Sequence, residues 1–149
     1  MTKAKRKKSW FHEHSLSIVS VTLLLAWIIG YSYCSQETRL KDFLGNSIAD
    51  WSGSVVIILG TKFLYEIGSA ESRPLKSRKN NRLLELLYEH SLLIFLALTG
   101  IGWLVLYLRL NPHNKWDQVV GNIVSEWLQM AGLVFLTKRL IERGSKESR

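Results

Sequence analysis

Two long stretches of the chain contain no charged residue, one between Glu13 and Glu37 and the other between Glu89 and Arg109. Each is long enough to cross a bilayer as a helix, which takes about 20 apolar residues. Mean hydropathy is nevertheless only +0.05, because the 21% of residues that are charged lie outside these stretches. This segregation argues against a soluble domain, and the single cysteine excludes disulfide scaffolds and zinc ribbons.

Two further segments are apolar but carry an acid near one end and a lysine near the other, Asp50 with Lys62 and Glu126 with Lys138. We therefore predict four membrane-spanning helices, at about residues 15–33, 47–67, 91–108 and 120–141. The first is too long for the apolar part of a signal peptide, so we expect it to be retained. In each weaker span 11 uncharged residues separate acid from lysine. That is about 18 Å of helix, so at least one charge must reach the headgroups or be buried in protein.

Basic residues concentrate on one side of these spans. If both termini share a side, 16 of the 20 Lys and Arg residues lie there. The positive-inside rule then predicts cytoplasmic termini, and we expect the basic face to contact anionic lipids. Nucleic-acid binding is not expected, because no aromatic interleaving or recognised fold accompanies the basic runs.

The chain contains an internal repeat in which residue i matches residue i+76 from Glu13 to Arg73. The repeat predicts an all-α fold of two tandem helical hairpins that insert in the same orientation, and it disfavours an inverted-repeat transporter. We divide the chain into a basic arm with an interfacial segment (1–14), a first hairpin (15–71), a basic linker ending in a short interfacial helix (72–90), and a second hairpin with a cytoplasmic tail (91–149).

The repeated acids Asp50 and Glu126 are the first candidate site. An ionisable group inside a span is a functional hypothesis by default. One interpretation is a ring of acids at an outer mouth that concentrates cations. The other is an interfacial carboxylate that touches water. Their neighbours Trp51 and Trp127 suit the outer interface, where indole rings sit.

Two aromatic pairs recur at helical spacing, Trp27 with Tyr31 and Trp103 with Tyr107. An aromatic belt or core filling is favoured over a cation–π site. Cys34 is interpreted as a small apolar residue near a helix end, with an intersubunit disulfide as the alternative.

His14 and His90 precede the first and third spans, each beside a glutamate. They are candidate pH sensors at the cytoplasmic face, or simply residues that order the helix start. Their spacing is not that of a metal site, and no metal or other cofactor is expected. Ser15 and Ser91 are predicted to cap the helices that follow.

The cytoplasmic ends of the second and fourth spans carry further repeated residues. Lys62 and Lys138 are predicted to extend to the lipid headgroups, and Gly68 and Gly144 to be helix C-caps. A tail motif surrounds these glycines, and we expect it to form a charge network with the His-Glu segments or to dock a partner; its other members are Ser69, Glu71, Ser72, Arg73, Ser145, Glu147, Ser148 and Arg149.

The chain opens with Trp10-Phe11 and Ser15–Val19 (SLSIV), its last span contains Ser125–Gln129 (SEWLQ), and its tail contains Arg143–Ser148 (RGSKES). Together these segments resemble a family of small bacterial four-span membrane proteins of unknown function. The first hairpin departs from the family pattern at Asp50–Gly53 (DWSG), and the loops are shorter. The resemblance implies a bacterial inner-membrane location and assigns no activity.

No catalytic motif is present, and an enzyme is not expected. A four-helix bundle fills its own interior, so any pore is expected between subunits of a homo-oligomer. The first functional hypothesis is a membrane protein that forms or gates a small permeation path, with Asp50 and Glu126 at its outer mouth. The second is a non-conducting scaffold or accessory subunit that docks a cytoplasmic protein or anionic lipid through the basic linker and tails.

Overall fold

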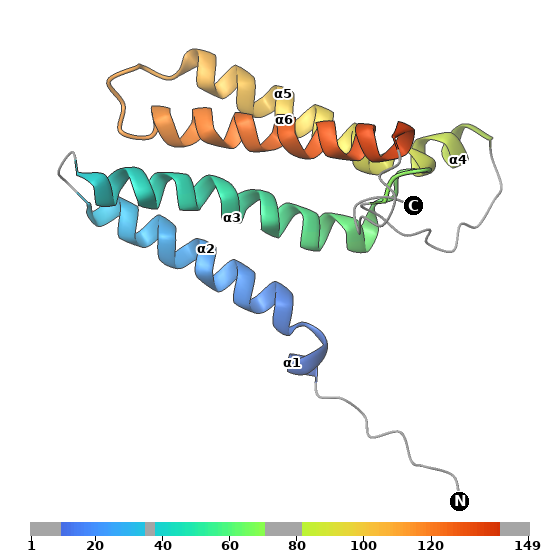
Figure 1. The fold of residues 1–149 in the computed structure, drawn as a ribbon, viewed down its shortest axis with the longest axis horizontal. Helices are drawn as coiled ribbons and strands as arrows, with labels where there is room; N and C mark the ends of the chain where they lie inside the picture. The colour runs from blue at the N-terminus through green and yellow to red at the C-terminus, as the bar shows by residue number, and fades with distance from the viewer. Residues whose placement is uncertain (1–9, 35–37, 71–81, 141–149) are drawn as a thin grey trace, which may run out of the picture.

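The computed structural model describes residues 10–34, 38–70 and 82–140, and all regular structure within them is helical (Figure 1). Four of the helices are long and apolar enough to cross a membrane, by length and composition, as the sequence predicted. In chain order the helices are α1 (Trp10–Glu13), α2 (Ser15–Tyr33), α3 (Arg39–Phe63), α4 (Arg82–Glu89), α5 (Ser91–Arg109) and α6 (Asp117–Arg139).

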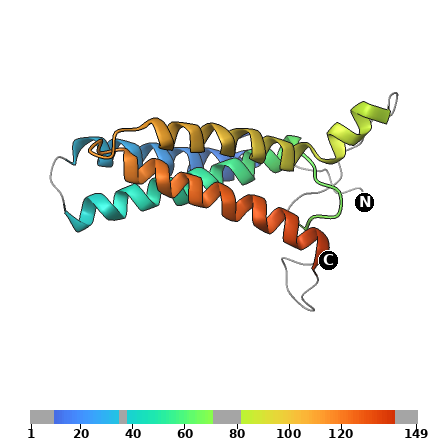
Figure 2. The same ribbon diagram turned by 90° about the horizontal axis from the view of Figure 1, so that it is seen from above.

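The four long helices lie in an open row in the order α2, α3, α6, α5 (Figure 1). α2 packs on α3, α5 packs on α6, and the two hairpins meet where α3 crosses α6 (Figure 2). Within the described residues, α2 and α5 share no comparable interface. A closed four-helix bundle was the expectation. In lipid, however, an apolar outer helix gains nothing from being buried against another one, so an open row is tolerated.

The first and third spans coincide with their predicted bounds to within one residue, whereas the second differs at both ends. α3 begins at Arg39, where the Thr38 hydroxyl accepts a hydrogen bond from the Lys41 backbone N–H (3.3 Å). It ends at Phe63, because Leu64 has extended backbone angles. Hydropathy missed the first two turns of α3 because they are polar, although they are helical.

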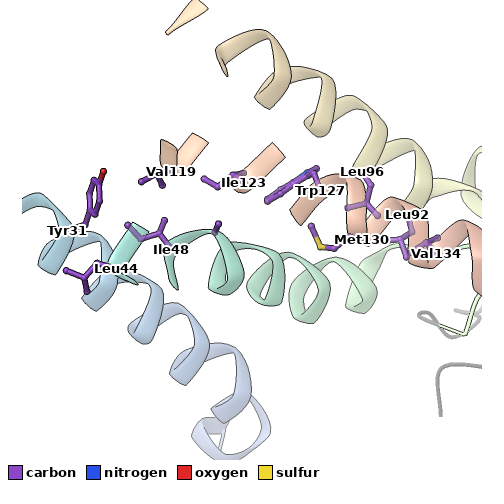
Figure 3. Packing of buried hydrophobic residues seen from close by; sticks show 11 residues of the cluster. Tyr31, Leu44, Ile48, Leu92, Leu96, Val119, Ile123, Trp127, Met130 and Val134 are labelled. Atoms are coloured by element: carbon purple, nitrogen blue, oxygen red, sulfur yellow. The ribbon is translucent and has the colours of Figure 1, made fainter. Parts of the chain in front are cut away.

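The core follows the contact between α3 and α6, and its side chains are drawn in Figure 3. In the apolar windows of these two helices 33% of residues are buried, against 11% in α2 and α5. The outer helices therefore present most of their apolar side chains outward. The buried cluster consists of Tyr31, Leu44, Ile48, Ala49, Leu92, Leu96, Val119, Ile123, Trp127, Met130 and Val134.

Tyr31 fixes the register between the two hairpins. Its ring lies against Gly45, where an added Cβ would be 3.4 Å from the ring and 3.2 Å from Val119 Cγ2. Its hydroxyl donates a hydrogen bond to the carbonyl of Lys115, just before α6. The tyrosine thus contacts its own hairpin partner and the other hairpin at once.

Candidate functional site

A column of four polar side chains runs along the crossing of α3 and α6. Asn46 and Asp50 lie four residues apart on α3, and Asn122 and Glu126 have the same spacing on α6, so each pair shares one helix face. The Asn122 side-chain amide donates a hydrogen bond to Asn46 Oδ1 (2.5 Å). One turn further on, Asp50 and Glu126 are neighbours that line the same surface hollows. The structure therefore brings the two predicted acids together.

The acids stand in the middle of a groove between the two helices. On one side of them is a hollow of about 270 Å³, on the other a hollow of about 350 Å³. Gly53 makes room for the second hollow, since a Cβ there would lie 3.3 Å from Glu126 Oε2. Besides the two acids, the first is lined by Asn46, Ala49, Asn122 and Ser125, and the second by Gly53, Ser54, Ile57, Ile58 and Met130.

The acids lie halfway along their helices. Asp50 is 11 residues after Arg39 and 13 before Phe63, so it is about 17 Å from the start of α3. On α6, the residue after Glu126 is Trp127, whose Nε1–H donates to Thr99 Oγ1 (2.8 Å) near the middle of α5. The sequence placed the acids near a helix end because it began the second span at residue 47.

The groove opens on the outer surface of the row. Leu44 faces α2, where a Cβ added at Gly30 would lie 3.5 Å from its side chain. Asn46, Asp50 and Ile57 lie on the opposite side of α3 from Leu44, as 3.6 residues per turn require. Asp50 is exposed and Glu126 is half-buried. In a bilayer, the groove would therefore face lipid or another protein surface.

Trp127 is 5% exposed and belongs to the core. Its ring contacts the surface of α5 at Gly100, where a Cβ would lie 3.4 Å from it, and stands 5.8 Å from the ring of Trp103. The interfacial position predicted for Trp127 is wrong, because the glycine leaves a recess in α5 and Thr99 accepts the indole N–H. Trp51 is half-buried.

The pair Trp27 and Tyr31 packs in or against the core, which was one of the two favoured interpretations. Trp27 packs edge-on against Phe43, with ring centroids 5.9 Å apart. Tyr31 is buried, whereas Tyr107, its counterpart 76 residues later, is exposed. At the end of α2, Cys34 is half-buried, with its Sγ 3.8 Å from Thr38 Oγ1.

The residues predicted to be cytoplasmic lie at one end of the row of helices. The short connections from α2 to α3 and from α5 to α6 lie at the other end. His14 and His90 are the N-cap residues of α2 and α5, and neither makes a side-chain capping bond. The prediction that Ser15 and Ser91 cap these helices is wrong. The Ser91 hydroxyl instead accepts from the Tyr65 backbone N–H (2.9 Å) and donates to the Tyr65 carbonyl (3.1 Å).

Lys62 and Lys138 have different surroundings. The Lys62 ammonium lies 5.3 Å from the centroid of the Phe63 ring. The Lys138 ammonium is directed to Glu66 Oε1, 2.8 Å away, and the ring Nδ1 of His90 lies 2.7 Å from the same oxygen. Glu66 was not selected from the sequence. Its recurrence as Glu142, 76 residues later, was the available signal.

Of the tail motif, the structure describes Gly68 and Ser69. Gly68 has φ of +87°, the left-handed value expected of a glycine cap, but it follows the end of α3 by five residues and is therefore not the C-cap. Ser69 is buried, with its hydroxyl 3.1 Å from Thr137 Oγ1. The remaining members lie outside the described residues: Glu71, Ser72, Arg73, Gly144, Ser145, Glu147, Ser148 and Arg149.

Within residues 10–34, 38–70 and 82–140, no group of three or more His, Cys, Asp or Glu side chains is arranged to hold a metal ion. Comparisons with protein-family models, with curated proteins and with solved structures give no match for this chain.

Proposed function

We propose that this chain is an integral membrane protein that assembles with further copies of itself, and that the α3–α6 groove lines a narrow cation path between subunits. The observation that carries the proposal is the position of Asp50 and Glu126. They face each other halfway along two membrane-length helices, in a groove that opens outward.

A carboxyl group in the hydrocarbon layer is costly unless protein, water or a counter-ion covers it. Asp50 and Glu126 are also like-charged neighbours when both are ionised, and a cation between them relieves their repulsion. A second copy of the chain supplies a suitable cover, because two such grooves placed face to face enclose one polar space. Rings of acidic side chains select cations in this way.

We further propose that both hairpins insert with the same orientation and that both termini face the cytoplasm of a bacterial cell, in its inner membrane. Two features support this: the 16 basic residues that fall on one side, and the resemblance of the terminal segments to the bacterial four-span family. The proposed role requires no enzymatic step and no cofactor.

Flux through liposomes tests the path. The purified chain is reconstituted, and uptake of a monovalent cation is followed with an entrapped indicator dye. We expect uptake above that of empty vesicles. We also expect it to fall by roughly tenfold in the Asp50→Asn/Glu126→Gln double variant, which corresponds to about 1.4 kcal/mol of lost cation stabilisation.

The matched control is Asp42→Asn, which removes an exposed acid from the first turn of α3 that lines neither hollow. It should leave uptake unchanged. Uptake equal to that of empty vesicles would discard the path and leave the non-conducting scaffold, which docks a cytoplasmic protein or anionic lipid through the basic linker. Normal uptake by the double variant would remove the acids from the mechanism.

A further inference from the structure

The segment after α3 does not leave the bundle directly but passes across the start of α5. The Ile67 backbone N–H donates to the Glu89 carbonyl (2.7 Å), and the Leu92 N–H donates to the Tyr65 carbonyl (3.1 Å). Glu66 lies between these two anchors, and its side chain is 0% exposed. The first hairpin thus places one carboxylate inside the second hairpin.

Two cationic or potentially cationic groups meet at a single oxygen of this carboxylate. Lys138 Nζ donates to Glu66 Oε1 over 2.8 Å, and His90 Nδ1 lies 2.7 Å from the same atom. The two nitrogens are only 3.4 Å apart. With its hydrogen on Nδ1, the neutral imidazole is a second donor to that oxygen.

Neighbouring contacts hold the lysine in place. The chain passes over its stem at Gly68, where a Cβ would lie 3.1 Å from Lys138 Cγ. Ser69 Oγ lies 3.1 Å from Thr137 Oγ1, on the preceding residue of α6. The end of α6 is therefore joined to the first hairpin by the ion pair, by the glycine contact and by the hydroxyl contact.

The charge of the cluster depends on the histidine. When the His90 ring is neutral, the negative charge of the Glu66 carboxylate is balanced by the positive charge of the Lys138 ammonium. A protonated ring adds a second positive charge 3.4 Å from the ammonium, on the same oxygen, at a site where burial weakens screening. Histidine is the side chain that ordinarily titrates between pH 5 and 8. The segment after α3, α4 and the end of α6 carry six other titratable side chains: Tyr65, Arg82, Glu85, Tyr88, Glu89 and Arg139.

All three residues of the cluster recur 76 positions away, as Glu142, His14 and Lys62. Glu142 lies outside the described residues. The recurrence of acid, histidine and lysine together is more than helix capping requires, since the histidines make no side-chain capping bond.

We propose that Glu66, His90 and Lys138 form a proton-operated latch between the two hairpins. Protonation of His90 displaces the Lys138 ammonium from Glu66 Oε1 and leaves the carboxylate paired with the imidazolium. The end of α6 is then released from the segment that follows α3. The latch does not depend on the proposed cation path, and its test uses no flux measurement.

Spin-label distances in lipid nanodiscs test the latch. In a Cys34→Ser background, labels are attached at Phe63→Cys and Leu140→Cys, both exposed, at the ends of α3 and α6. We expect a longer and broader distance distribution at pH 5.5 than at pH 8. A control pair at Leu40→Cys and Gln118→Cys, at the other end of the same helices, should not change.

Three variants separate the latch from a general effect of acid. His90→Asn keeps a side-chain donor but does not titrate, and it should hold the pH 8 distribution at both values. Lys138→Met removes the displaced charge and should show the released distribution at both. His113→Asn, in the loop before α6, should behave as the parent. An unchanged distribution in the parent, or a pH response that survives in His90→Asn, overturns the proposal.

Discussion

At the scale of single residues, the decisive positions are those where a side chain is missing or unexpectedly buried. Gly53 leaves room for Glu126, and Gly68 lets the chain turn over the stem of Lys138. Glu66 is completely buried, and the contacts with Lys138 and His90 make that burial tolerable. Each of these residues matters because of what lies opposite to it in space.

Gly68→Ala should destabilise the protein by about 1–2 kcal/mol, because its φ of +87° is unfavourable for a residue with a Cβ. The added methyl group would also press on Lys138 Cγ. Unfolding by denaturant in detergent micelles, followed by circular dichroism, measures the change.

Gly102→Ala is the matched control, since a Cβ there meets nothing within 4 Å. It lies inside α5 and should stabilise the helix by about 0.5–1 kcal/mol. Equal effects of the two substitutions would contradict the role given to Gly68.

At the scale of elements, the contact between α3 and α6 determines both the core and the candidate site. One side of this contact holds buried apolar residues such as Ile48 and Ile123, and the other holds the column of amides and acids. The same pair of helices therefore supplies the packing that holds the hairpins together and the groove that we propose as a path.

The two repeated glycines Gly45 and Gly121 should respond differently to alanine. At Gly45 the new methyl group meets Val119 and Tyr31, both 2% exposed, which have no space to move. At Gly121 it meets Tyr107, which is 39% exposed and can turn outward.

We therefore expect Gly45→Ala to cost about 1–3 kcal/mol and Gly121→Ala less than about 1 kcal/mol. Unfolding in mixed micelles compares them. A larger loss for Gly121→Ala would mean that Tyr107 is held more firmly than its exposure indicates.

At the scale of the whole molecule, the open row accounts for the many exposed apolar side chains. Among the described residues, α2 and α5 contact the rest of the protein along one side only and bury 11% of their apolar windows. Apolar surface of this extent is unfavourable in water but ordinary against lipid. The architecture is therefore that of a chain whose outer helices are surrounded by lipid.

The proposed orientation predicts which connections reach each side of the membrane. In a Cys34→Ser background, a membrane-impermeant maleimide should label His113→Cys, between α5 and α6, from outside intact cells. It should label Asn80→Cys, between the hairpins, only after the membrane is permeabilised. Labelling of both positions from the same side would contradict two parallel hairpins with cytoplasmic termini.

The number of long helices, the bounds of α2 and α5 and the choice of Asp50 and Glu126 as a pair could all be predicted from the sequence. These properties are local: hydropathy depends on consecutive residues, and a repeat can be seen without knowing what packs against what. The start of α3 was missed for the same reason, because hydropathy does not distinguish a polar helical turn from a loop.

Which side chains are buried and which charges meet depends instead on how the helices pack. Trp127 is buried because its ring packs on Gly100 of α5 and its indole N–H donates to Thr99. Glu66 is buried because the chain after α3 runs over the start of α5. Such contacts join residues that are far apart in the chain; Glu66 and Lys138 are 72 positions apart. No local pattern encodes them, because the free energy of a buried charge depends on the partner that the fold brings to it.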